Sequence, residues 1–118
     1  MLGILTVTDF RNSETWNEAR FIVCTLLEFT KRWSKHLRYR RLARDVERLS
    51  VSLLDNMTQG YERKGDRSFL SRAQRSIDEL ESALQKVEER GAINKLESVQ
   101  LTDGLDAVKQ SLKNDERS

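Results

Sequence analysis

Residues 48–84 read RLSVSLLDNMTQGYERKGDRSFLSRAQRSIDELESAL, and this stretch decides the fold. Apolar residues recur at spacings of mostly three and four on both sides of a corner at residues 60–66. Before the corner they are Leu42, Val46, Leu49, Leu53 and Met57, and after it Phe69, Ala73, Ile77, Leu80, Leu84 and Val87. This period places each set along one side of a helix. Two apolar stripes joined by a short corner predict an antiparallel helical hairpin.

Both flanks of the hairpin carry one further helical pattern. Ser13 suits the cap of a preceding helix, and Asn94 suits the cap of a following one, while Gly91 ends the helix between. The apolar stripe of the first helix comprises Trp16, Ala19, Val23, Leu26, Leu27, Thr30 and Trp33, and that of the last Leu101, Leu105, Val108 and Leu112. The pattern predicts an all-α, antiparallel up-down-up-down four-helix bundle over residues 13–113. We expect residues 1–12 to form an extended arm and residues 114–118 a frayed tail.

Three local features predict the positions of single residues in this bundle. Cys24 lies beside the first apolar stripe, where a small core residue is its simplest interpretation. At the corner, Gly65 suits a left-handed position, and Asp66 or Ser68 suits the cap of the next helix. Gly104 weakens the last helix but favours close approach of another helix.

Composition excludes several classes of protein. The chain has 118 residues, no Pro, one Cys and one His, and 34% of its residues are charged. The absence of Pro favours nearly continuous helix. Because Cys24 is the one cysteine, no internal disulfide can form. Cys24 and His36 together supply too few ligands for a zinc site. We expect no metal and no cofactor. The apolar N-terminus does not have the form of a signal peptide, and no run is long enough to span a bilayer, so we expect a cytoplasmic protein.

Catalytic patterns are missing from the sequence. No Ser/His/Asp or Cys/His pairing falls at helical spacing, and no glycine-rich phosphate loop occurs. Glu-x-x-His pairs, which di-iron bundles need, are also missing. We therefore expect the protein not to be an enzyme.

Charge is unevenly distributed along the chain. Residues 1–77 carry fifteen Lys/Arg against nine Asp/Glu, whereas residues 78–118 carry six against ten. Such asymmetry is typical of a protein whose basic half meets an anionic partner. It is equally typical of two halves, or two subunits, that attract each other.

Residues 31–48, KRWSKHLRYRRLARDVER, hold eight of the basic residues and two acids. Arg41, Arg44 and Arg48 share the helix face that points away from the apolar stripe, and Arg40 lies at its edge. Arginine donates two parallel hydrogen bonds to phosphate, and the interleaved Trp33, His36 and Tyr39 suit stacking on unpaired bases. The alternative is a solvated helix face with Trp33 in the core.

The hairpin also resembles a known family. Asn56, Gly60-Tyr61, Arg63, Phe69, Ala73, Ser76 and Glu79-Leu80-Glu81 follow the pattern of the four-helix-bundle family named after proteins encoded in intervening sequences of bacterial large-subunit ribosomal RNA. Phe10, Trp16, Ala19 and Arg20 extend the resemblance to the first helix. Asp55 and Gln59 depart from the pattern, because the family usually has Pro and Glu there.

The resemblance implies a function beyond the fold. Proteins similar to this family form five-subunit rings, and one branch is the accessory variability determinant of diversity-generating retroelements, which binds a reverse transcriptase and RNA. We therefore expect a homo-oligomer, namely a pentamer, that binds RNA or DNA as an accessory subunit of a reverse transcriptase. The alternative is a protein-interaction scaffold whose arginines meet the acidic surface of a neighbour, at Asp78, Glu81, Glu88 and Glu89. The expected nucleic-acid-binding residues are Lys35, Arg38, Arg40, Arg41, Arg44, Arg48, Arg63 and Lys64.

Overall fold

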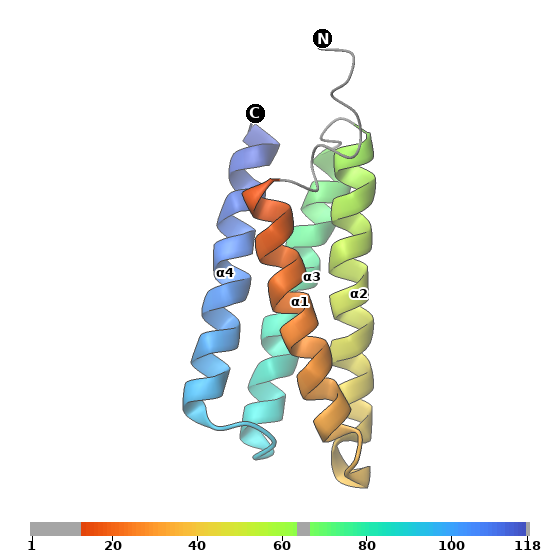
Figure 1. The fold of residues 1–118 in the computed structure, drawn as a ribbon, viewed down its shortest axis with the longest axis vertical. Helices are drawn as coiled ribbons and strands as arrows, with labels where there is room; N and C mark the ends of the chain where they lie inside the picture. Colours follow the sequence, from red (N-terminus) through yellow and green to blue (C-terminus); the bar gives the residue numbers. More distant parts are fainter. Residues whose placement is uncertain (1–12, 64–66, 118) are drawn as a thin grey trace.

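The computed structural model describes residues 13–63 and 67–117. They form the helices α1 (Glu14–Trp33), α2 (Arg40–Glu62), α3 (Arg67–Glu89) and α4 (Lys95–Arg117), with a short 3-10 helix, η3 (Leu37–Tyr39), before α2. Successive helices run antiparallel, and α4 packs against α1 to close the bundle (Figure 1). The predicted all-α four-helix bundle is therefore confirmed for the described residues. The predicted arm and the corner residues Gly65 and Asp66 lie outside them.

The core follows the apolar stripes of the sequence. The largest side chains that are completely buried are Val23 and Leu26 from α1, Val46, Leu53 and Met57 from α2, Leu70, Ile77, Leu80, Leu84 and Val87 from α3, and Leu105 and Leu112 from α4. The α3 stripe differs from the prediction at its start, because Leu70 is buried and Phe69 is only half-buried. Burying this apolar surface is what holds the helices together.

α1 begins where the sequence predicts. Ser13 is extended, and its hydroxyl accepts a hydrogen bond from the backbone N–H of Trp16 at 3.1 Å. The prediction that Cys24 lies in the core is wrong, since its side chain is exposed. A helix turns about 100° per residue, which moves Cys24 out of line with the buried Val23 and Leu26.

The corner of the α2–α3 hairpin is shorter than the predicted residues 60–66. α2 continues to Glu62, so Gly60 belongs to its last turn and not to the corner, and Ser68 lies inside α3 and is not its cap. A Cβ atom on Gly60 would lie 2.9 Å from Cδ2 of Leu70, so glycine permits the close approach of the two helices. Further along, the hydroxyls of Ser52 and Ser76 lie 3.4 Å apart across the hairpin.

The α3–α4 turn uses glycine and asparagine as predicted. Gly91 has a φ of 85°, a left-handed conformation that only glycine adopts without strain. Asn94 then caps α4: its Oδ1 accepts from the N–H of Glu97 at 2.8 Å, and Glu97 accepts from the N–H of Asn94 at 3.0 Å. This reciprocal pair is a capping box. It starts α4 at a defined residue.

Glycine also allows α4 to pack closely on α1. A Cβ on Gly104 would lie 2.9 Å from Cδ1 of Ile22, so the predicted close approach at Gly104 is confirmed. α4 continues to Arg117, and residues 114–117, which we predicted as a frayed tail, form its last turn. The hydroxyl of Tyr61 donates to Asp115 and ties the end of α2 to the end of α4.

Candidate nucleic-acid interface

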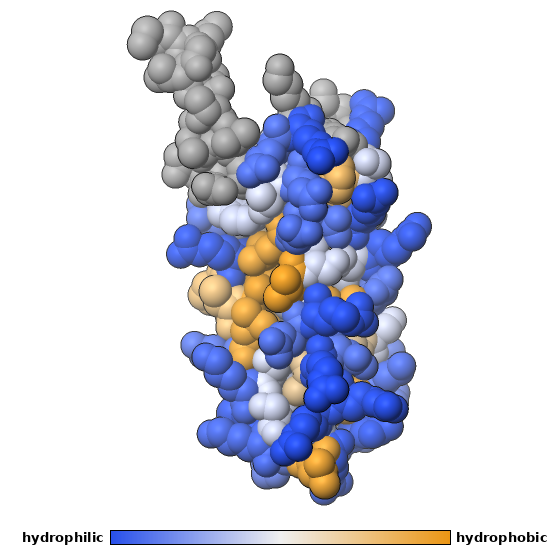
Figure 2. Space-filling model, turned by 90° about the vertical axis from the view of Figure 1, so that its right-hand side faces the viewer, coloured by the Kyte–Doolittle hydropathy of each residue, from blue (hydrophilic) through white to orange (hydrophobic). Residues whose placement is uncertain are grey.

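The outer face of α2 carries the arginine stripe, which we define as Arg40, Arg41, Arg44 and Arg48. All four side chains are exposed, and the buried Leu42, Val46, Leu49 and Leu53 lie on the opposite side of the helix. Figure 2 faces α2 and shows hydrophilic side chains over most of this side of the bundle, around a smaller apolar area. Val51, which is 55% exposed, lies one turn beyond the stripe. The sequence therefore predicted the direction of these arginines correctly.

Carboxylates of the described residues do not neutralise the stripe. Their ion pairs join Arg32 to Glu97, Lys95 to Glu88, and Lys109 to Asp78, and all involve α4. Arg48 does border a shallow groove of about 330 Å³ between α2 and α3 that also contains Asp45, Asp78 and Glu79, but it forms no ion pair with them. The guanidinium groups of the stripe thus form no ion pair with the carboxylates of the described residues.

The turn before α2 extends this basic surface. Lys35 and Arg38 are exposed there, and the guanidinium carbon of Arg38 lies 5.1 Å from the centre of the Tyr39 ring. Tyr39 in turn donates from its hydroxyl to the carbonyl of Arg90 at 3.1 Å, which fixes the turn against the end of α3. Lys35 and Arg38 therefore occupy exposed positions just before the stripe.

The three interleaved aromatic residues differ in their exposure to solvent. Trp33 is only 3% exposed and belongs to the core. Tyr39 is half-buried, whereas His36 is exposed and meets Tyr39 edge to face, with ring centres 6.0 Å apart. Of the alternative interpretation, the placement of Trp33 in the core is confirmed, so Trp33 is not available for stacking on bases.

The remaining predicted residues lie elsewhere. Arg63 follows α2 at its far end, about 22 Å from Arg48 at 1.5 Å of rise per residue. The guanidinium group of Arg63 lies over the Phe69 ring and is not next to the stripe. Lys64 lies outside the described residues. The sequence prediction grouped these residues by their charge and did not consider their distance along α2.

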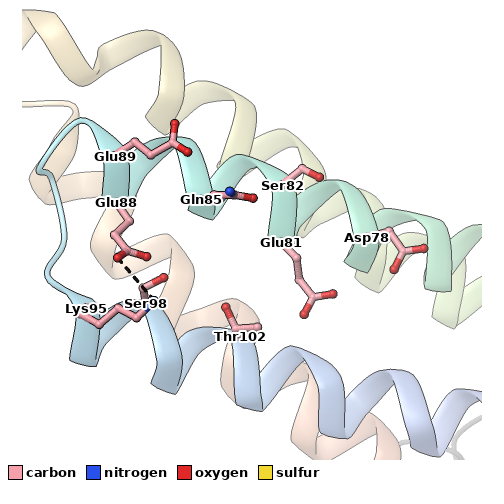
Figure 3. A pocket seen from close by; sticks show the side chains of 9 residues that line it. All are labelled: Asp78, Glu81, Ser82, Gln85, Glu88, Glu89, Lys95, Ser98 and Thr102. Atoms are coloured by element: carbon pink, nitrogen blue, oxygen red, sulfur yellow. Dashed lines mark ion pairs between the residues drawn. The ribbon is translucent and has the colours of Figure 1, made fainter.

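An acidic groove of about 610 Å³ lies between α3 and α4 (Figure 3). Its α3 side presents Asp78, Glu81, Glu88 and Glu89, the acidic residues that the scaffold alternative invoked. Lys95 from α4 borders it and pairs with Glu88 at 3.9 Å. The bundle therefore separates a basic face on α2 from an acidic one on α3 and α4.

At the edge of this groove lies a pair of facing carboxyl groups that the sequence pattern did not reveal. Glu81 on α3 faces Asp106 on α4, and burial, followed by the hydrogen bond with Asp106 and its charge, raises the pKa of Glu81 to about 7. The ammonium group of Lys109 opposes this shift, and Asp78 adds to it. A signal for the pair existed: Glu81 and Asp106 lie at similar distances from the α3–α4 turn, so an antiparallel hairpin brings them together.

In the described ranges, the helices are too short or too polar to cross a membrane. Nor do residues 13–63 and 67–117 gather three or more His, Cys, Asp or Glu side chains in an arrangement that holds a metal ion.

The chain is similar to a family of known proteins. Residues 11–114 match the family model described as 23S rRNA-intervening sequence protein, which covers all of α1, α2 and α3 and most of α4. Neither the curated proteins nor the solved structures give a match.

Proposed function

The chain belongs to the 23S rRNA-intervening sequence protein family, and from this premise we propose that it is a non-enzymatic, homo-oligomeric protein that binds nucleic acid through the outer face of α2. The observation that carries the proposal is the arginine stripe, whose four exposed side chains form no ion pair with a described carboxylate. Unpaired arginines on one rigid helix face suit a row of phosphates, because each can donate two parallel hydrogen bonds.

We propose further that the oligomer is a pentamer and that it serves as an accessory subunit of a retroelement reverse transcriptase. The resemblance stated above implies this role. In a ring, the stripe is repeated by symmetry, so weak phosphate contacts on several subunits add through avidity. The partners in this proposal are other copies of the chain, RNA or DNA, and the reverse transcriptase.

The alternative function is a protein-interaction scaffold without a direct nucleic-acid role. The acidic groove favours it, because its carboxylates complement the stripe of a neighbouring copy. Replacing Glu88 and Glu89 with Gln would then reduce the oligomer mass, whereas a nucleic-acid role predicts no loss of mass from these changes.

Binding to a structured RNA across a salt series, with oligomer mass recorded on the same sample, tests the proposal. Each phosphate that the protein neutralises should steepen the slope of log affinity against log salt by about 0.7–0.9. A steep slope with an intact oligomer supports nucleic-acid binding. No binding at low salt by an intact oligomer would assign the arginines to a protein interface.

A further inference from the structure

A second basic group lies at the other end of the α2–α3 hairpin. The guanidinium carbons of Arg63 and Arg72 lie 4.8 Å and 5.0 Å from the centre of the Phe69 ring. Arg63 follows the end of α2, and Arg72 lies on α3, so two elements contribute to one cluster. We call it the Arg63–Phe69–Arg72 cluster. Both arginines are exposed, and Phe69 is half-buried.

This cluster is arranged to receive an anion. Both guanidinium groups are held near one ring by cation–π contacts, so the two positive charges lie within about 10 Å of each other. Neither takes part in the ion pairs of the described residues. A phosphate bound there would reduce the repulsion between the two charges and accept their N–H donors.

The cluster lies beyond the arginine stripe along α2. Arg63 comes fifteen residues after Arg48 and nineteen after Arg44, which at 3.6 residues per turn places it about 60° and about 100° around the helix axis from them. Along the axis it lies about 22 Å from Arg48 and about 34 Å from Arg40. α2 is continuous across this interval, so the separation of the two basic groups is fixed.

The surface between the two groups is different in character. Asp55 on α2 is exposed there and accepts a hydrogen bond from Gln59 at 2.9 Å. An acid at this position would repel a phosphate backbone that ran continuously over the face. It would not repel two separate backbone crossings with an open groove between them.

We propose that the arginine stripe and the Arg63–Phe69–Arg72 cluster bind two backbone crossings of one double-stranded nucleic acid, about one helical turn apart. A turn of a duplex measures roughly 34 Å, and the arginines of the stripe lie about 22–34 Å from Arg63 along α2. A duplex presents its phosphates at a fixed spacing, so a rigid pair of basic sites is already organised for it, whereas a flexible single strand must lose freedom to reach both. The inference rests on the proposed nucleic-acid role and names its substrate class.

The test compares the Arg63→Gln/Arg72→Gln variant with the unchanged protein and with a control, Arg20→Gln/Lys31→Gln, which removes two exposed positive charges from α1. Affinity is measured for a duplex of about 14 base pairs, longer than one turn, for one of about 6 base pairs, and for a single strand of the longer length. Unchanged circular dichroism and oligomer mass establish that each variant is folded.

We expect the Arg63→Gln/Arg72→Gln variant to lose about tenfold or more in affinity for the longer duplex, with a salt slope lower by about 1–2. Affinity for the short duplex should not change, and the control should retain most of its affinity for both. Equal loss on the single strand, or no loss on the longer duplex, would overturn the inference and leave the proposed function standing. If the unchanged protein binds none of the three at low salt, the proposed function itself fails.

Discussion

The carboxyl pair between α3 and α4 makes the stability of the bundle depend on pH. Burial raises the pKa of Glu81 to about 7, and Asp106 and Asp78 act in the same direction while Lys109 acts against it. Because the folded pKa lies above the unfolded value of 4.5, the folded chain binds this proton more tightly. The contribution of the Glu81 proton to the free energy of unfolding is therefore fully present below about pH 4.5, and it is lost as the pH rises through about 7.

The size of the effect follows from the two pKa values. Their difference corresponds to about 3 kcal/mol, but Glu81 borders an open groove, so solvent screening reduces the expected effect to about 1–2 kcal/mol. Glutamine resembles the protonated carboxyl group and does not ionise. Glu81→Gln should therefore leave the free energy of unfolding nearly unchanged at pH 4 and raise it by about 1–2 kcal/mol at pH 8.

Urea unfolding of the two proteins at pH 4 and pH 8 measures this difference, and Glu79→Gln on the exposed side of α3 is the matched control. The control removes the same charge from a neighbouring position, so it should show little dependence on pH. If Glu81→Gln changes stability by the same amount at both pH values, the carboxyl pair does not share a proton and the reasoning fails.

Three further predictions concern packing and backbone geometry. Tyr61→Phe removes the hydrogen bond to Asp115 and should lower the free energy of unfolding by about 1 kcal/mol, measured in urea. Gly91→Ala places a side chain at a φ of 85° and should cost about 1 kcal/mol, seen as a lower Tm; an unchanged Tm would contradict the assigned conformation. Leu53→Ala empties a completely buried position and should cost about 2–5 kcal/mol, whereas a loss below 1 kcal/mol would place Leu53 outside the core.

The sequence predicted the features that depend on one helix at a time. Leu53 and Leu80 are buried because helical spacing alone sets which way they face. Asn94 caps α4 because a capping box needs only residues three positions apart. The same holds for Arg44, whose exposure follows from its position opposite the apolar stripe.

Features that depend on the relation between helices were harder to predict. The pairing of Glu81 with Asp106 requires the register of α3 against α4, which neither helix pattern contains. Arg63 was grouped with the stripe because both are basic, although the length of α2 separates them. The burial of Cys24 was predicted wrongly, because a small apolar residue at the edge of an apolar stripe can be either buried or exposed.

The most direct test of the nucleic-acid role is the salt dependence of RNA binding by Arg41→Gln/Arg44→Gln/Arg48→Gln. Its control is Arg20→Gln/Lys31→Gln/Lys113→Gln, which removes the same charge from α1 and α4. If the stripe binds phosphates, the slope of log affinity against log salt should fall by about 2–3 for the stripe variant and by less than 1 for the control. Equal slopes for the stripe variant and the unchanged protein, with both folded and of the same oligomer mass, would contradict the account.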